Sequence, residues 1–285
     1  ANTTYVVKDT NASVGGLKYL QTDATWGTAT ATLTWFQLGG GSATTTTGLA
    51  TSTSHTISIS AVNGDNTASS TYSSTVTLST LAAVPAAPAT VTSTLATTLA
   101  ITINTTTLNS NPTSTASFIV RDTASGTLFL QTNGNWGSAT ATLTWAQLGS
   151  GSATTTTGLT ANTNHVIDVA AVNQDSTATT TYGATTTAYT LGSVPSALTF
   201  TNDNQARSIT VSWTGDGTRY YVENVTDGTN SGLITATSYG NTGLGCNASY
   251  AYRVYSTNVQ GTQSAFTATS SLQTLTCISA GGGGG

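Results

Sequence analysis

The chain has 285 residues, a net charge of −4 and only 6% charged side chains, against about 25% in a typical soluble domain. Its six basic residues are too few for the basic stripe of a nucleic-acid binder or the polybasic patch of a membrane-surface binder. No apolar run approaches the ~20 residues that a transmembrane helix needs. We therefore expect no nucleic-acid partner and no membrane span.

The composition favours β-structure throughout. Thr, Val, Ile and Tyr suit a pleated, half-buried strand, whereas the abundant Thr and Ser are weak helix formers. Eleven Tyr, five Phe and five Trp supply large side chains for cores, and at roughly 100 residues per domain the length indicates about three small domains. The chain begins with Ala1 rather than Met, so we expect that a secretory signal or a longer precursor segment has been removed.

A long repeat divides the chain. The segment Leu20–Ala50 returns 110 residues later as Leu130–Thr160, and Pro85 returns as Pro195. A fixed offset of this kind reveals architecture before any strand is assigned. The predicted parts are a first unit at residues 1–83, a second at 84–193, a third at 194–280 and a glycine tail at 281–285.

The first unit starts at what is the third strand of a complete unit. Its segment Tyr5–Asp9 aligns with Phe118–Asp122 of the second unit, which uses residues 84–112 for two preceding strands, A and B. The first unit has no counterpart of that stretch. We therefore expect it to lack strands A and B.

Period-2 alternation predicts the strands of the other two units in chain order. In unit two they are B at Leu99–Thr105, C at Ala116–Asp122, C′ at Thr127–Gln131, a strand across Ala139–Leu148, F at His165–Asn173 and G at Thr181–Thr190. In unit three they are A at Leu198–Thr201, B at Ser208–Trp213, C at Arg219–Glu223, F at Ser249–Asn258 and G at Ala265–Leu275.

The third unit carries a specific set of residues. Trp213 ends an alternating strand, Tyr220 and Tyr221 lie on the next one, and Leu244 is followed six residues later by Tyr250. Over almost the whole unit this pattern resembles a fibronectin type III domain, which is an immunoglobulin-like β-sandwich. The resemblance implies an all-β fold of tandem sandwiches.

In that family the Leu and the Tyr six residues later form the tyrosine corner that leads into strand F. Units one and two keep the Leu but place His55 and His165 where the Tyr stands. The resemblance implies that Tyr250, His55 and His165 are structural corner residues, each buried and hydrogen-bonded to the backbone. Unit two also carries NPTST at residues 111–115, which is similar to fibronectin-like repeats of bacterial or archaeal cell-surface and filament proteins.

Titratable groups, which must converge for catalysis, are scarce: ten acids, two His and two Cys. No Ser/His/Asp or Cys/His order, metal-ligand spacing, phosphate-binding glycine motif or repeated carboxylate pair is present in the sequence. We expect no enzyme activity, no metal and no cofactor, and we interpret Asp168 as an acid on the surface of a strand.

Five Trp raise the alternative of carbohydrate binding. Trp35, Trp145 and Trp213 lie in alternating stretches, so we predict that they pack in cores. Trp26 and Trp136 stand beside Gly in connecting segments and are the candidate glycan-binding residues on an exposed face.

The two cysteines flank the last predicted hairpin. Cys246 precedes strand F, Cys277 ends strand G, and the midpoint between them falls on the turn, so an antiparallel hairpin brings them opposite each other. We predict a disulfide, which indicates an oxidising, extracellular setting. The candidate N-glycosylation sites are Asn2, Asn11, Asn104, Asn224 and Asn247, and the Thr tracts at 44–47 and 154–157 permit O-glycosylation.

Together these features predict a structural subunit of an extracellular filament or cell-surface array. A sandwich without strands A and B leaves strand edges and its core open. We expect another copy of the chain to close unit one by adding a strand against Tyr5 and Val7, and the expected donor is the segment from Ile278 onward. Head-to-tail addition gives an open homopolymer. The alternatives are an adhesin or carbohydrate-binding array that recognises cell-surface glycans, and a non-catalytic stalk of a secreted hydrolase.

Overall fold

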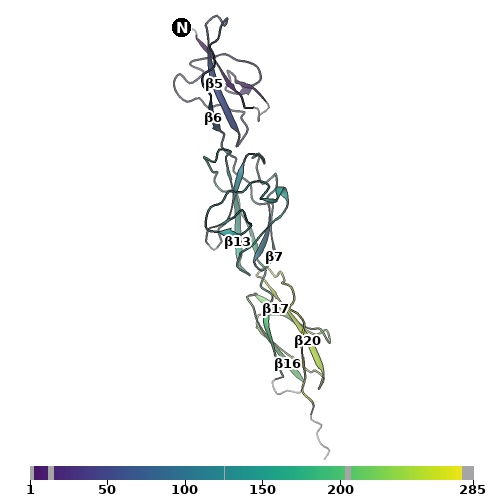
Figure 1. The fold of residues 1–285 in the computed structure, drawn as a ribbon. Helices are drawn as coiled ribbons and strands as arrows, with labels where there is room; N and C mark the ends of the chain where they lie inside the picture. Colours follow the sequence, from purple (N-terminus) through teal and green to yellow (C-terminus); the bar gives the residue numbers. More distant parts are fainter. Residues whose placement is uncertain (1–2, 12–15, 125, 203–206, 278–285) are drawn as a thin grey trace, which may run out of the picture.

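The computed structural model describes residues 3–11, 16–124, 126–202 and 207–277. Within these ranges the regular secondary structure consists of β-strands and one 3₁₀ turn, η2 (Gly149–Gly151). None of the described elements is a helix long and apolar enough to cross a membrane. Figure 1 shows three units that follow one another along an elongated molecule. The prediction of an all-β chain built from tandem fibronectin type III-like sandwiches is confirmed.

The second unit is a complete sandwich of two antiparallel sheets. The larger sheet has the order β11-β10-β9-β13-β14, and the smaller one has the order β12-β8-β7. The larger sheet comprises β9 (Ser117–Asp122), β10 (Leu128–Leu130), β11 (Trp136–Gly137), β13 (Asn164–Val172) and β14 (Thr186–Tyr189). The smaller sheet comprises β7 (Thr90–Leu95), β8 (Thr98–Thr102) and β12 (Thr154–Thr156). Strands A, B and E therefore cover strands C, C′, F and G.

The core of unit two forms because its inner strands alternate between apolar and polar residues. Leu99, Ile101 and Ile103, on and just after β8, pack in one cluster with Phe118 and Val120 of β9. All five side chains are at most 2% exposed. Since alternate strand residues point to one face, this triplet covers the larger sheet along its length. Burial of each large apolar side chain contributes about 1.5–3 kcal/mol.

The third unit repeats this arrangement with sheets β15-β16-β19 and β18-β17-β20-β21. Its strands are β15 (Ser196–Thr201), β16 (Ser208–Thr214), β17 (Arg219–Asn224), β18 (Asn230–Ile234), β19 (Ser238–Thr242), β20 (Ser249–Thr257) and β21 (Ser270–Gln273). Alternate residues of β16, Ile209, Val211 and Trp213, pack with Val222 and Tyr252. Strand G is shorter than its predicted range.

The first unit has a single sheet in its described residues. The order is β3-β2-β1-β5-β6, and β4 also pairs with β1. The strands are β1 (Thr4–Asp9), β2 (Lys18–Leu20), β3 (Trp26–Gly27), β4 (Leu33–Thr34), β5 (Ser54–Val62) and β6 (Val76–Ser79). They correspond to strands C, C′, F and G of the complete units. The described part of unit one contains no strand equivalent to β7 or β8.

Strand E is lost from unit one as well. The sequence GSATTTTGL stands at residues 41–49 and again at 151–159. In unit two it forms β12, which pairs with β8 through Thr154↔Ile101 and Thr156↔Leu99. In unit one the same sequence forms no strand. The reason is that β12 depends on β8 for its ladder of hydrogen bonds, and unit one has no equivalent of β8 among its described residues.

The predicted strand across Ala139–Leu148 is wrong. Only Leu143 makes a bridge, to Phe118, and the chain then enters a turn that begins at Thr144. The Thr144 N–H donates to Gln147 Oε1 at 2.8 Å, and the Gln147 N–H donates to Thr144 Oγ1 at 3.3 Å. This reciprocal pair is a capping box, so Thr-x-x-Gln bends the chain into a turn in spite of the alternation around it. Thr34 and Gln37 repeat it in unit one.

Candidate assembly surface

The inner face of the unit-one sheet is only partly covered by the residues that the structure describes. Val7 of β1 lies opposite Ile59 of β5, and His55 of β5 lies opposite Leu78 of β6. Directly opposed residues of antiparallel strands share a face, and Tyr5 shares the face of Val7 because side chains alternate. In unit two the equivalent face is the one that packs against β7 and β8.

Equivalent positions of the two units differ sharply in exposure. Ile59 is 37% exposed, whereas its equivalent Val169 in β13 is 0% exposed. Leu78 is 48% exposed, whereas its equivalent Ala188 in β14 is 5% exposed. Because the sheets have the same strand order, the difference arises from the missing second sheet rather than from a change within the first one.

The core that remains in unit one is small. It contains three buried apolar residues, Val7, Leu20 and Leu33, whereas the core of unit two contains sixteen. Tyr5 is half-buried, and its ring lies 6.3 Å from that of Trp35. Of the residues predicted to take part in assembly, Tyr5 and Val7 therefore lie on the inner face. Ile278 lies outside the described residues.

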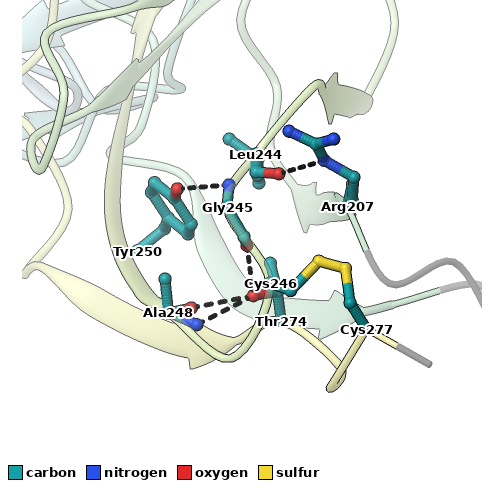
Figure 2. The surroundings of a disulfide bond; sticks show 8 residues. All are labelled: Arg207, Leu244, Gly245, Cys246, Ala248, Tyr250, Thr274 and Cys277. Atoms are coloured by element: carbon teal, nitrogen blue, oxygen red, sulfur yellow. Dashed lines mark hydrogen bonds between the residues drawn. A yellow bond between two sulfur atoms is a disulfide. The ribbon is translucent and has the colours of Figure 1, made fainter. Parts of the chain in front are cut away.

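The predicted disulfide between Cys246 and Cys277 is present, with Cα atoms 5.4 Å apart (Figure 2). It joins the loop before β20 to the chain that leaves β21. Beside it, the Thr274 hydroxyl donates to the carbonyl of Gly245 at 2.6 Å and accepts from the Ala248 N–H at 3.0 Å. The end of strand G is therefore tied to the corner covalently and through its side chain.

Tyr250 stands at this corner, half-buried against the unit-three core. Its hydroxyl accepts a hydrogen bond from the Gly245 N–H at 2.7 Å (Figure 2). Leu244 is 4% exposed, and its carbonyl accepts from Arg207 Nε at 2.9 Å. The side chain of Tyr250 thus bonds to the backbone, in the manner that the resemblance implies for a tyrosine corner.

The equivalent histidines are buried but bond differently. His55 and His165 are 0% and 2% exposed, and the prediction that their rings bond to the backbone is wrong. Nδ1 of His55 lies 2.6 Å from a carboxylate oxygen of Asp9, and Nδ1 of His165 lies 2.6 Å from one of Asp122. An imidazole is shorter than a phenol, so a carboxylate from strand C fills the remaining distance and binds the backbone in its place.

Asp122 shows how this works. Its second carboxylate oxygen accepts from the Val166 N–H at 3.0 Å and from the Ala124 N–H at 3.1 Å. Burial raises the pKa of Asp122, but the hydrogen bonds from His165 and from these two N–H groups outweigh it, so the pKa lies below its ordinary value. The carboxylate is therefore held ionised as a structural link between strands C and F.

Asp168 is buried rather than on the surface as predicted. It is 3% exposed, and its two oxygens accept from Arg121 Nε at 3.0 Å and from Arg121 Nη2 at 2.6 Å. The two residues face each other across β9 and β13, and the Tyr182 ring covers the guanidinium at 3.5 Å. The pair is a covered structural contact on the outer face of the sheet.

The tryptophans depart from prediction in both directions. Trp213 is 4% exposed in the core, and Trp145, half-buried in the capping-box turn, packs against the core of unit two, both as predicted. Trp35, by contrast, is 57% exposed. Trp136 is 9% exposed and Trp26 is half-buried, so the prediction of an exposed aromatic face is wrong. Each lies opposite a buried Leu across a hairpin, which directs its ring into the core.

The candidate N-glycosylation sites differ in accessibility. Asn247 is exposed, whereas Asn11 and Asn104 are half-buried. Asn224 is 0% exposed, so the folded chain leaves no room for a glycan on its amide. Asn2 lies outside the described residues. Glycosylation at the exposed and half-buried sites stays a prediction.

The described residues contain no group of three or more His, Cys, Asp or Glu side chains placed to hold a metal ion. The buried polar pairs found here, Asp9–His55 and Asp122–His165, were not foreseen from the sequence. A signal was present, however, because each Asp ends strand C in both repeats while each His begins strand F. Strands C and F are neighbours in this sandwich, so the repeat brings both pairs together in the same way.

No protein-family model and no curated protein matches the chain. Among solved structures it is similar to the FN1–FN3 domains of chicken CNTN1, with 16% identity over 95% of this chain and 88% of the other, at a TM-score of 0.30. A two-domain fibronectin type III segment of chicken tenascin is 18% identical over 65% of this chain and 97% of the other, at a TM-score of 0.40. A structure described as FN3tt mut is 19% identical over 29% of this chain and 96% of the other, at a TM-score of 0.26. The sheet order described above, rather than these superpositions, establishes the fold.

Proposed function

We propose that this chain is a non-catalytic structural subunit of an extracellular filament or cell-surface array that assembles head to tail with copies of itself. The observation that carries the proposal is the partly covered inner face of unit one, where Ile59 and Leu78 are 37% and 48% exposed. An open sheet face with free edges favours addition of a strand from another chain. Because the donor and acceptor surfaces differ, such addition continues as an open fibre.

The covering strand has a recognisable requirement. In unit two the cover is the triplet Leu99, Ile101 and Ile103. In unit three the equivalent triplet, 110 residues later, is Ile209, Val211 and Trp213. Both triplets are occupied within their own units. The expected donor is the segment that follows Cys277, because it comes after the last predicted strand in the sequence and has Ile278 and Ala280 two residues apart, the spacing at which side chains of a strand share a face.

Two further features support an extracellular structural role. The Cys246–Cys277 disulfide is typical of proteins in oxidising compartments. The 6% charged fraction suits a body that packs against copies of itself more than one that depends on charge repulsion for solubility. The adhesin alternative loses its candidate glycan-binding residues, since Trp26 and Trp136 face the cores, and no observation favours the stalk.

The inner face is tested with a matched pair of substitutions on one strand. We expect Leu78→Lys to prevent assembly, because it places a charge on the inner face, whereas Thr77→Lys on the opposite face of β6 leaves assembly unchanged. Sedimentation velocity and electron microscopy of the full chain measure the outcome. If the two variants assemble equally well, the inner face is not the acceptor and the proposal is wrong.

The donor is tested by deletion of residues 278–285. We expect the shortened chain to stay unassembled while units two and three remain folded by circular dichroism. Normal assembly of the shortened chain would exclude this segment as the donor. An unaltered chain that stays monomeric at every concentration would overturn the filament function itself.

A further inference from the structure

Each unit ends in the same hydrogen-bonded corner. The Thr directly after strand G donates its hydroxyl to a carbonyl in the loop before strand F, and that loop turns at a residue of positive φ. The hydroxyl bonds are Thr80 to Ala50 at 2.6 Å, Thr190 to Thr160 at 2.7 Å and Thr274 to Gly245 at 2.6 Å. The turning residues are Ser52 (φ 47°), Asn162 (φ 49°) and Asn247 (φ 50°).

In units one and two this corner contacts the following unit. Thr51 Oγ1 donates to the Ser110 carbonyl at 2.9 Å, and the Ser52 carbonyl accepts from Thr115 Oγ1 at 3.1 Å. Asn162 Nδ2 donates to the Asp216 carbonyl at 2.6 Å. All three partners, Ser110, Thr115 and Asp216, lie in the B–C loop of the next unit. Two junctions of different sequence therefore use the same pair of surfaces.

The chain that leaves the corner is also held by the following unit. The Asn111 side chain bonds both the N–H and the carbonyl of Ala83, at 2.8 and 2.6 Å. The Asp216 carboxylate accepts from the N–H and the hydroxyl of Ser193, each at 2.6 Å. Ala83 and Ser193 each stand three residues after the corner Thr, as Cys277 does in unit three.

In the part of the chain that the structure describes, the unit-three corner carries a disulfide at the positions where the other two corners contact a following unit. Cys277 takes the position of Ala83 and Ser193, and Cys246 takes the position of Thr51, one residue before the turning residue. The bond holds Cys277, where the chain leaves the corner, against the loop before strand F. Asn247 is exposed, whereas Ser52 at the equivalent position of unit one is 0% exposed, so the turning residue of this corner remains open.

The opposite end of the molecule presents the complementary half. In units two and three the F–G turn begins with Asn173 and Asn258, each 2% exposed, and Asn258 Nδ2 donates to the Thr190 carbonyl of the preceding unit at 3.3 Å. In unit one the equivalent Asn63 is exposed. No described residue therefore covers the F–G turn of unit one in the way that the preceding unit covers Asn258.

We propose that the corner of unit three, formed by residues 245–248 and 274–277, docks onto the F–G turn of unit one in a second copy of the chain. The contact between copies then repeats the junctions between units, and the Cys246–Cys277 disulfide directs the exiting segment along the same path as the internal linkers. This inference rests on the proposed filament function and assigns its second contact surface. The occupant is a second copy because both halves of the junction belong to this chain.

The docking contact and the strand addition have separate roles. Within the chain, the covalent linker keeps the two halves of each polar junction at high effective concentration. Between copies there is no such linker, and a few hydrogen bonds over a small area do not hold proteins together on their own. The added strand supplies the burial, and the corner sets the direction and register of the next subunit.

The test compares two exposed leucines of unit three in the full chain. Leu275 in the corner is 41% exposed, and Leu233 on the side of β18 is 48% exposed, so Leu275→Glu and Leu233→Glu make the same change at similar exposure. We expect Leu275→Glu to raise the concentration required for assembly at least tenfold, and Leu233→Glu to leave it unchanged. Thr276→Arg, at another exposed residue of the corner, is the second corner variant, and thermal unfolding of both variants checks that the effect does not come from misfolding.

A mixing experiment adds an independent readout. A corner variant keeps its unit-one end, so it adds to a growing fibre and then blocks further growth at one end; one part in ten should shorten wild-type fibres severalfold in electron micrographs. If both corner variants assemble like Leu233→Glu, the docking surface is wrong while the filament function stands. If the unaltered chain never assembles, both the filament function and the docking surface are wrong.

Discussion

Buried carboxylates anchor the corner histidines of units one and two. Asp9 and Asp122 are 2% and 1% exposed, yet each is hydrogen-bonded to a His ring and to backbone N–H groups. Burial of a charge is costly unless every lone pair finds a partner. These pairs therefore tie strand C to strand F at the edge of the core. A hydrophobic residue in place of either Asp would leave the backbone N–H groups of strand F without a hydrogen-bond acceptor.

We expect Asp122→Ala to destabilise unit two by about 3–5 kcal/mol, since it leaves His165 and the Val166 N–H without a buried partner. Thr187→Ala, on the exposed side of β14, is the control and should change stability by less than about 0.5 kcal/mol. Urea unfolding followed by tryptophan fluorescence measures both. A loss of similar size in the two variants would contradict the structural role of the pair.

The same carboxylate makes stability depend on pH in acid. The pKa of Asp122 lies below its ordinary value of 3.8, so ionised Asp122 favours the folded state. The stabilisation is complete at neutral pH and is lost as the pH falls from about 4 through the folded-state pKa. Thermal unfolding of the unaltered chain should therefore shift to lower temperature below pH 4, and this shift should shrink in Asp122→Ala.

Tyr252 gives the opposite dependence in alkali. Burial raises its pKa to about 12, although the hydrogen bond from Asn241 Nδ2 to the hydroxyl at 3.1 Å acts against the rise. A raised pKa means that folding favours the protonated phenol, so its stabilisation is present below pH 10 and is lost as the pH rises towards 12. Burial also raises the pKa of Tyr182, Tyr220 and Tyr255, so absorbance titration at alkaline pH should show several tyrosines ionising late. Tyr252→Phe should remove the last of these steps.

Units two and three each have an ion pair between strands C and F, and the acidic and basic residues stand on opposite strands in the two units. Arg121 on β9 faces Asp168 on β13, whereas Glu223 on β17 faces Arg253 on β20. In both units an aromatic ring covers the guanidinium, Tyr182 at 3.5 Å and Phe266 at 4.0 Å. In units two and three the outer face of the C–F pair thus carries opposite charges and an aromatic cover, in either orientation, whereas in unit one Lys8 lies opposite Ser58 under the Tyr72 ring.

The hairpin of strands F and G in unit three carries the disulfide. The disulfide closes a loop with a sequence separation of 31 residues. By restricting the unfolded chain, it should contribute about 3–4 kcal/mol to the free energy of unfolding. We expect Cys246→Ala/Cys277→Ala to lower the unfolding temperature of unit three alone. Differential scanning calorimetry with and without a reductant measures this, and the double variant should no longer respond to the reductant.

At the scale of the molecule, polar junctions hold the three units in line. The junction of units two and three depends on Asp216, which is exposed and binds Ser193 twice. We expect Asp216→Ala to broaden the distance distribution in small-angle X-ray scattering while the unfolding temperature of unit three stays nearly constant. Asp227→Ala, an exposed acid of the same unit away from the junction, should leave the distribution unchanged.

The sequence by itself determined the β class, the period of 110 residues, the absence of strands A and B from the described part of unit one, and the pairing of Cys246 with Cys277. These follow from local alternation, repetition and hairpin symmetry. Local signals failed where two of them competed: alternation around residues 139–148 favoured a strand, but the capping box at Thr144 and Gln147 bends the chain there.

Only the tertiary structure decided which faces are covered. The sequence GSATTTTGL forms a strand in unit two and none in unit one, and the equivalent Trp145 and Trp35 are half-buried and 57% exposed. A strand needs a neighbour to accept its hydrogen bonds, and a side chain needs an opposite layer to exclude water. Both requirements are met by residues distant in the chain, so identical local sequences adopt different structures where that second layer is absent.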